Sequence, residues 1–199
     1  MLFNWLQLHG GLLFDSPPNT LEVYMLITYK NLKIRSATSD DAQMLCNWWN
    51  DGDVMAHAGF PNGLSTNADK IIQDLSTDSD NTYRRLIIEV NSVPVGEMSC
   101  RNKGDGVAEI GIKVCDVTKQ ERGNGTLFLK MLITDRFNNG YEKIVLDTNV
   151  KNTRAQHVYE KIGFQRLRTN RDSWKNQLGE LQSSIDYELL RAQFIPLDI

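Results

Sequence analysis

The chain has 199 residues, of which 41% are hydrophobic, and this is typical of one globular domain with a sizeable core. Its formal net charge of −3 argues against a general nucleic-acid binder, which needs a basic face. No apolar run reaches the roughly 18 residues that a membrane-spanning helix needs, and three unpatterned cysteines indicate reduced thiols in a cytoplasmic protein.

The N-terminal segment differs in character from the rest. Residues 1–14 are apolar but lack the basic region and the cleavage site of a signal peptide. Glu22-Val23, just before Met25, can be encoded by a bacterial ribosome-binding sequence. We therefore divide the chain into residues 1–24, hypothesised to be a translated leader, and a single domain over residues 25–199. The alternative is a genuine N-terminal arm that packs on the domain or on a second subunit, and the N-terminal mass of the endogenous protein distinguishes the two.

The first elements of the domain are a strand and two helices. Residues 32–35 alternate as a strand. Residues 38–41 are rich in N-cap side chains and predict a helix that ends near Asn50. Residues 65–66 are expected to cap a second helix. Its predicted apolar stripe is Ile71, Ile72 and Leu75.

Three strands are predicted in the middle of the chain. Residues 85–90 and 93–100 flank Asn91-Ser92, which predicts a tight hairpin. The turn at residues 104–106 leads into a further strand over residues 107–114. The pattern therefore favours three consecutive antiparallel strands.

The last third alternates helices and strands. A helix over about residues 123–138 is apolar nearly all round, which predicts that it lies between layers rather than on a surface. Asn139-Gly140 is its expected C-cap. Residues 144–149 form an apolar run typical of a buried strand. Two more strands are expected, one after Phe164 and one over residues 184–189.

A glycine-containing turn opens that helix. In residues 120–126, two glycines let backbone N–H groups approach a bulky anion, and the helix N-terminus adds unpaired donors and partial positive charge. This predicts a seat for phosphate or pyrophosphate, the alternative being a plain turn before a core helix. The turn lacks the Lys-Ser or Lys-Thr of a P-loop and the third glycine of a dinucleotide fingerprint.

A second motif follows the strand at residues 144–149. Residues 149–164 match the spacing Asn-x-x-Asn-x-x-Ala-x-x-x-Tyr-x-x-x-Gly-Phe, and residues 120–125 match Gln/Arg-x-x-Gly-x-Gly/Ala. In this order, the two motifs resemble the signatures of the GNAT superfamily of N-acetyltransferases, over about residue 32 to the C-terminal region. Residues 48–61 further resemble its ribosomal-protein N-acetyltransferase-like (RimJ/RimL-type) subgroup, which implies a bacterial protein.

The resemblance implies the acyl-CoA N-acyltransferase fold, of the α/β (α+β) class. We expect a mixed, mostly antiparallel sheet of about seven strands, splayed between its fourth and fifth strands and flanked by about four helices. The expected order of elements is strand, two helices, three antiparallel strands, helix, strand, helix and two strands.

The resemblance also implies an acetyl-CoA site. The pyrophosphate would lie over the glycine turn, and the pantetheine arm would bind main-chain atoms of the fourth strand. The residues so implied are Ile112, Lys113, Val114, Gln120, Arg122, Gly123, Asn124, Gly125, Thr126, Asn149 and Asn152. Asn152 can equally cap a helix starting near Thr153, and the two roles are compatible. The three histidines lack ligand spacing, so no metal site is expected.

Two residues are implied to be catalytic. Tyr159 matches the family's general acid, and a phenol with a pKa of about 10 is a suitable proton donor to a departing thiolate. The alternative is a packed core tyrosine. Glu109 corresponds to a strand carboxylate that acts as general base, the alternative being a side chain on a solvated face. Glu97, Asp147 and His57 are its rivals as base.

In this family the two early helices and their loop wall the acceptor site. Trp48, Trp49, His57 and Phe60 are therefore expected at the acceptor. The alternative for these residues is core packing, and we expect it for at least one of the tryptophans.

The implied activity is transfer of an acetyl group from acetyl-CoA to a primary amine of a peptide N-terminus or a small molecule. We expect a monomer or homodimer with neither nucleic acid nor membrane as partner. One alternative is an aminoglycoside 6′-N-acetyltransferase, for which Asp51, Asp53 and Glu97 would supply an acidic patch. The other is a non-catalytic acyl-CoA-binding regulatory module, against which an intact Tyr159 argues.

Overall fold

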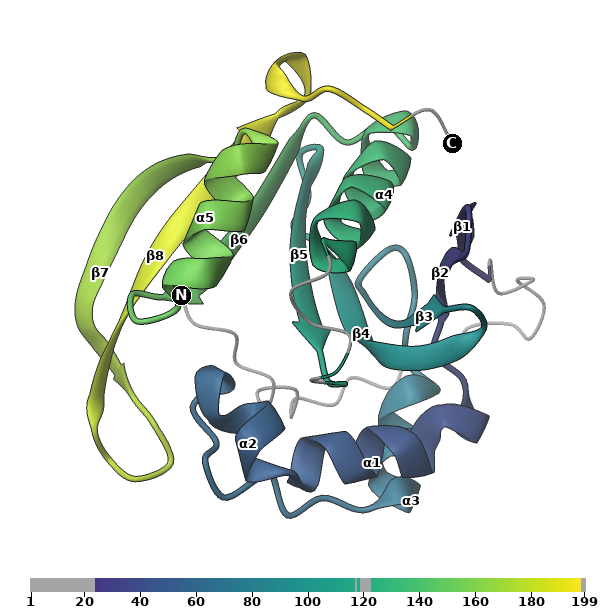
Figure 1. Cartoon of the computed structure of the whole chain (residues 1–199), viewed down its shortest axis with the longest axis vertical. Coiled ribbons are helices and arrows are strands. Elements are labelled where there is room, and N and C mark those ends of the chain that lie inside the picture. Colours follow the sequence, from purple (N-terminus) through teal and green to yellow (C-terminus); the bar gives the residue numbers. More distant parts are fainter. Residues whose placement is uncertain (1–23, 117, 119–122, 198–199) are drawn as a thin grey trace.

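The computed structural model describes residues 24–116, 118 and 123–197, in which one eight-stranded sheet carries helices on both faces (Figure 1). The hypothesised leader lies outside the described residues except for Tyr24. The strands are β1 (Leu26–Tyr29), β2 (Leu32–Ser36), β3 (Tyr83–Val90), β4 (Val93–Asn102), β5 (Val107–Val114), β6 (Lys143–Asn149), β7 (Gln165–Lys175) and β8 (Leu181–Leu190). The α-helices are α1 (Ala42–Asn50), α2 (Gly52–Met55), α3 (Ala68–Leu75), α4 (Asn124–Asn138) and α5 (Thr153–Ile162).

The strands lie in the order β1-β2-β3-β4-β5-β6-β8-β7, and every neighbouring pair is antiparallel except β5–β6. This confirms the predicted fold class and the mixed, mostly antiparallel sheet. The hairpin at Asn91 and Ser92 forms as expected, with φ of 53° and 61°, the left-handed pair that suits a two-residue turn.

Strand β1 is an element that the pattern did not indicate, as is the short helix α2. Strand β1 has four residues, Leu-Ile-Thr-Tyr, and the apolar neighbours Leu26 and Ile27 hide the alternation in which Ile27 alone is buried. Pairing with β2 holds it in place: Leu26 lies opposite Arg35, and Ser36 N donates to Met25 O at 2.9 Å. The extra strand explains why the sheet has eight strands rather than about seven.

The sheet splays open between β5 and β6. Their parallel register joins three residue pairs, from Val107 opposite Lys143 to Glu109 opposite Val145. Beyond these pairs the carboxyl-terminal halves of the two strands separate. This is the predicted splay, which falls between the fifth and sixth strands once β1 is counted.

The larger core lies between the sheet and helices α4 and α5. Helix α4 is buried nearly all round, as predicted. Besides the sheet, the C-terminal segment covers it: the Phe137 and Phe194 rings lie 5.5 Å apart, and Leu197 N donates to Thr134 Oγ1 at 3.1 Å. None of the helices in the described ranges is long and apolar enough to cross a membrane.

Helices α1 to α3 cover the opposite face and enclose a smaller core. Thr38 and Asp41 form a capping box before α1. For α3 the predicted caps are wrong, because the side chain of Asn67 accepts from Lys70 N at 2.8 Å instead of residues 65–66. Ile72 is 42% exposed, so the apolar stripe of α3 consists of Ile71 and Leu75.

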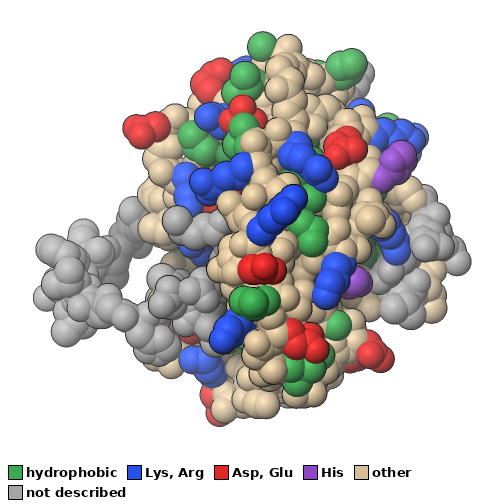
Figure 2. All heavy atoms as spheres, turned by 90° about the vertical axis from the view of Figure 1, so that its left-hand side faces the viewer, with side chains coloured by type: hydrophobic (Ala, Val, Ile, Leu, Met, Phe, Trp, Pro, Cys, Tyr) green, Lys and Arg blue, Asp and Glu red, His purple; other side chains and the backbone are tan. Residues whose placement is uncertain are grey.

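Strand β7 forms one edge of the sheet and, with β8, a long hairpin that extends to α2 (Figure 1). Lys and Arg side chains gather on the face of the molecule that includes this edge (Figure 2). Arg166, Arg168, Arg171 and Lys175 of β7 are all exposed. Charged side chains on an edge strand oppose pairing with another chain.

Candidate active site

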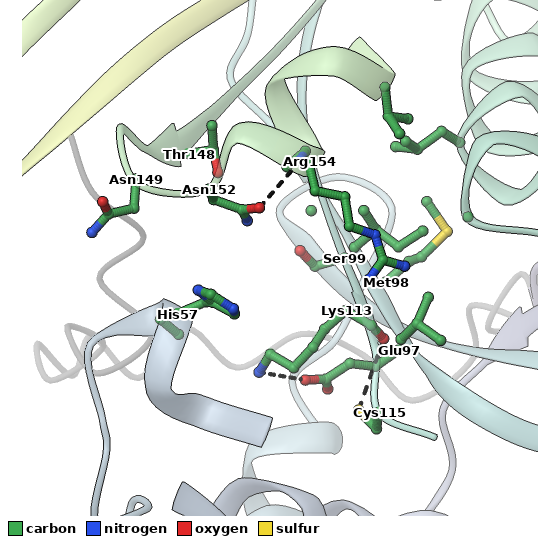
Figure 3. A pocket seen from close by; sticks show the side chains of 18 of the residues that line it. His57, Glu97, Met98, Ser99, Lys113, Cys115, Thr148, Asn149, Asn152 and Arg154 are labelled. Atoms are coloured by element: carbon green, nitrogen blue, oxygen red, sulfur yellow. Dashed lines mark hydrogen bonds and ion pairs between the residues drawn. The ribbon is translucent and has the colours of Figure 1, made fainter. Parts of the chain in front are cut away.

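A cavity of about 700 Å³ lies where β5 and β6 separate. Residues of β4, β5, β6, α2, α4 and α5 line it, so both faces of the sheet contribute. Its size falls within the range of small-molecule sites. Figure 3 shows that Asn149 and Asn152 lie across this space from Glu97 and Lys113.

Several residues implied to bind the cofactor line the cavity. They are Ile112, Lys113, Val114, Gly125, Asn149 and Asn152. Gly123 is the N-cap residue of α4 with φ of 78°, a conformation that favours glycine, and Asn124 and Thr126 belong to the first turn of that helix. Gln120 and Arg122 lie outside the described residues.

Gly125 adjoins open space. A Cβ built at this position meets no heavy atom of the described residues within 4 Å. Because Gly125 lines the cavity at the N-terminus of α4, the helix presents its first turn to an unfilled volume. The local arrangement therefore suits an anionic group approaching the backbone.

The two asparagines have roles in the fold as well as places in the cavity. Asn152 caps α5 by accepting from Ala155 N at 3.2 Å. Asn149 accepts from Lys151 N at 2.9 Å and donates to Gln182 Oε1 at 3.1 Å. Asn152 thus caps the helix and lies beside the cavity, and its binding of the cofactor stays a prediction.

Tyr159 also lines the cavity, from α5. Its ring packs against Phe164 and Tyr187, with centroids 5.9 and 5.7 Å away. None of the described side chains hydrogen-bonds with its hydroxyl. Burial, together with the nearby charge of Asp147, raises the pKa of Tyr159, so the phenol keeps its proton at neutral pH.

Asp147 of β6 is half-buried and faces the same cavity. Burial raises the pKa of its carboxyl group to about 7, and the charges of Glu109 and Asp186 act in the same direction. Asp186 lies directly opposite Asp147 in the β6–β8 register and is itself bonded to Arg168 and Asn170. Asp147 therefore changes its protonation state near neutral pH.

Glu109 lies outside the cavity lining, and its role as general base stays a prediction. It lies in the paired part of β5, opposite Val145. Lys103 Nζ lies 3.1 Å from its carboxylate, and Arg101 Nε lies 4.0 Å away. Glu109 belongs to the last residue pair before the two strands diverge.

Glu97 and Lys113 form a buried polar group at the cavity (Figure 3). They face each other across the β4–β5 register, and Lys113 Nζ lies 3.1 Å from Glu97 Oε1. The indole of Trp49 donates to the same carboxylate at 2.9 Å. Glu97 is 2% exposed, so these partners satisfy a carboxylate that is almost completely removed from water.

Of the four residues expected at the acceptor, His57 lines the cavity. Trp49 is buried in the smaller core, and Trp48 and Phe60 pack against that core. Both tryptophans thus pack in or against the smaller core, and the indole of Trp49 also donates to Glu97 at the cavity. Trp49 is buried and Trp48 partly buried in the packing of α1 with α3 and the sheet, which composition alone does not reveal.

Two charged residues near this cavity were not singled out from the sequence. Arg154 of α5 lines the cavity, yet it occupies a variable position of the second motif. The charge of Asp186 raises the pKa of Asp147, and no local sequence pattern connects these two residues. In the described part of the chain, no three His, Cys, Asp or Glu side chains cluster as metal ligands.

The sequence matches the acetyltransferase (GNAT) domain family over residues 31–165. No curated protein matches the chain. Among solved structures, it resembles a spermidine N-acetyltransferase from Vibrio cholerae in complex with CoA and spermine, with 20% identity, a TM-score of 0.72 and coverage of 82% of this chain and 97% of the other.

Two further structures have similar folds. The ribosomal-protein-S5-alanine acetyltransferase from Vibrio fischeri is 14% identical, with a TM-score of 0.72 over 86% of this chain and 100% of the other. A GNAT-family acetyltransferase from Bacillus anthracis is 20% identical, with a TM-score of 0.69 over 83% of this chain and 98% of the other. At these identities the likeness shows the fold.

Proposed function

Since the chain belongs to the GNAT acetyltransferase family, we propose that it acetylates a primary amine on a small molecule or a peptide N-terminus. It is an acetyl-CoA-dependent N-acetyltransferase. The observation that carries the proposal is that Tyr159, Asp147 and Gly125, from three different elements, line one cavity.

The residues present fit acetyl-CoA. Gly125 adjoins open space at the N-terminus of α4, where backbone N–H groups and the helix dipole favour a pyrophosphate. Residues 112–114 line the cavity on the part of β5 that has separated from β6, along which an extended arm can lie. Asn149 and Asn152 line the same cavity at the end of β6 and the start of α5.

Gly125→Leu is expected to abolish the thermal stabilisation that acetyl-CoA gives. At about a hundredfold excess over Kd, the wild-type protein should gain about 2.7 kcal/mol in free energy of unfolding. The leucine side chain would fill the open space that Gly125 adjoins. A thermal-shift titration measures this, and the ligand-free variant should melt close to wild type, because the new Cβ meets no atom of the residues that the structure describes. Equal stabilisation of variant and wild type would refute the pyrophosphate seat.

Tyr159 and Asp147 supply the two proton transfers of the reaction. Acetyl-CoA provides the thioester carbonyl that the amine attacks. The carboxylate of Asp147 accepts a proton from the amine nitrogen, either directly or through one water. Tyr159, which burial keeps protonated, would donate its proton to the departing thiolate sulfur as the carbon–sulfur bond breaks. We place the base at Asp147 rather than Glu109 because Asp147 lines the cavity.

A cationic acceptor suits the lining. Asp51 and Asp53, at the start of α2, and Glu97, from β4, all line the cavity, although Lys113 neutralises Glu97. This observation favours an aminoglycoside as a second candidate acceptor. The structural neighbour that binds spermine makes polyamines a third class to test.

A thiol-release assay with acetyl-CoA tests the proposal. Polyamines, aminoglycosides and peptides with a free N-terminal alanine should be compared, and we expect amine-dependent release of CoA with at least one class. Mass spectrometry should find one added acetyl group on the acceptor. If acetyl-CoA binds but no amine in these classes reacts, the acceptor proposal fails.

A further inference from the structure

The tip of the β7–β8 hairpin is attached to the loop that follows α2. Gln177 N donates to Gly59 O at 2.8 Å, and its side chain donates through Nε2 to Gly63 O at 2.9 Å. Asn62 N in turn donates to Gln177 Oε1 at 2.9 Å. One glutamine thus joins two segments that are more than a hundred residues apart in the sequence.

An aromatic contact reinforces this attachment. The ring of Trp174 lies so close to Gly59 that a Cβ at that position would collide with it. Gly59 also has φ of 93°, which ends the 3-10 turn Ala56–Ala58. A glycine is therefore required here both by the backbone conformation and by the approach of the hairpin.

The hairpin tip is itself well ordered by local hydrogen bonds. Asn176 Oδ1 accepts from Leu178 N at 3.0 Å and from Glu180 N at 2.9 Å, and Asn176 N donates to Glu180 O at 3.0 Å. These bonds fix the turn from which Gln177 projects. The tip can therefore act as a rigid support rather than a loose contact.

The attached loop forms part of the cavity wall. His57 and Ala58, immediately before Gly59, line the cavity on the side of the sheet where α1 to α3 lie, as do Asp53 and Val54 of α2. Figure 3 shows His57 facing the space between Asn149 and Lys113. Whatever holds Gly59 to Gly63 in place also holds this wall.

We infer that Gln177 is a positioning residue for the acceptor. By joining the hairpin tip to residues 59–63, it holds the part of the cavity wall formed by His57 and Ala58, the His57 wall, in the position that the acceptor amine requires. This inference rests on the proposed transferase function. Among the described residues, the hydrogen bonds of Gln177 reach the 59–63 loop and not β5, α4 or α5, which form the cofactor side of the cavity. Loss of Gln177 should therefore affect the acceptor and spare acetyl-CoA.

Gln177→Ala tests the inference, with Leu178→Ala as the matched control, because Leu178 is the next residue of the tip and is 59% exposed. Amide hydrogen exchange at Asn62 should become faster in Gln177→Ala and stay unchanged in Leu178→Ala. The acceptor KM should rise by roughly tenfold or more when the wall loses its position, while kcat and the KM for acetyl-CoA stay within about twofold. Gly59→Ala should reproduce the effect by forcing Trp174 away.

The outcomes separate two failures. An inactive wild-type enzyme would count against the proposed acceptor classes, and exchange at Asn62 would still report on the attachment. An active wild type, with Gln177→Ala showing either unchanged exchange or an unchanged acceptor KM, would overturn the inference alone. A rise in the KM for acetyl-CoA equal to that for the acceptor would also overturn it, because it would indicate a general loss of structure.

Discussion

Tyr159→Phe is expected to lower kcat by roughly a hundredfold or more, the usual effect of removing a general acid. The ring remains in its packed position between Phe164 and Tyr187, so only the proton donor is lost. The loss should fall on the transition state, leaving the acceptor KM and the binding of acetyl-CoA nearly unchanged. Steady-state kinetics with a reactive amine and a thermal-shift titration with acetyl-CoA measure the two effects.

Tyr187→Phe is the matched control for this variant. Tyr187 packs against Tyr159 at 5.7 Å, but its hydroxyl donates to Glu160 Oε1 at 3.1 Å and does not line the cavity. Removing that hydroxyl should leave kcat within about twofold, since no proton-transfer group is lost. Near wild-type turnover by Tyr159→Phe would assign Tyr159 to packing alone.

Asp147→Asn should lower kcat/KM by roughly a hundredfold at pH 8, because the amide cannot accept a proton. The loss of rate in Asp147→Asn should become larger as pH rises. Asp147 acts as base only when ionised, and its pKa is raised to about 7, so the ionised fraction rises as pH rises through that value. The ratio of wild-type to variant rates should therefore shrink below pH 7 and level off above it. A ratio that is constant from pH 5 to 9 would exclude Asp147 as the base.

Glu109→Gln distinguishes the two carboxylates. If Glu109 were the base, this variant would lose activity as severely as Asp147→Asn. In our proposal the charge of Glu109 only raises the pKa of Asp147, so removing that charge should shift the acid limb of the pH profile to lower pH and preserve the plateau. Asp186→Asn should shift the limb in the same direction, because Asp186 faces Asp147 across the β6–β8 pair.

The sequence was sufficient where the determinants are local. The turn before α4 needs a glycine because Gly123 has a positive φ, and the apolar surface all round α4 requires cover on every side. In the second motif, Asn149 ends β6, Asn152 caps the N-terminus of α5, and Gly163 is the first residue after that helix. Because these features depend on residues within one or two turns, both motifs and the elements between them could be read from the sequence.

Tertiary structure alone decided which charges and aromatic rings meet. Trp49 lies in the smaller core because α1 packs against α3 and the sheet, and Glu109 is excluded from the cavity because β5 and β6 still pair at that residue. The environment of Asp147 depends on its register with β8, and the His57 wall depends on a hairpin tip far along the chain. Strand register and long-range loop contacts follow from the packing of the whole domain, and no local pattern of residues encodes them.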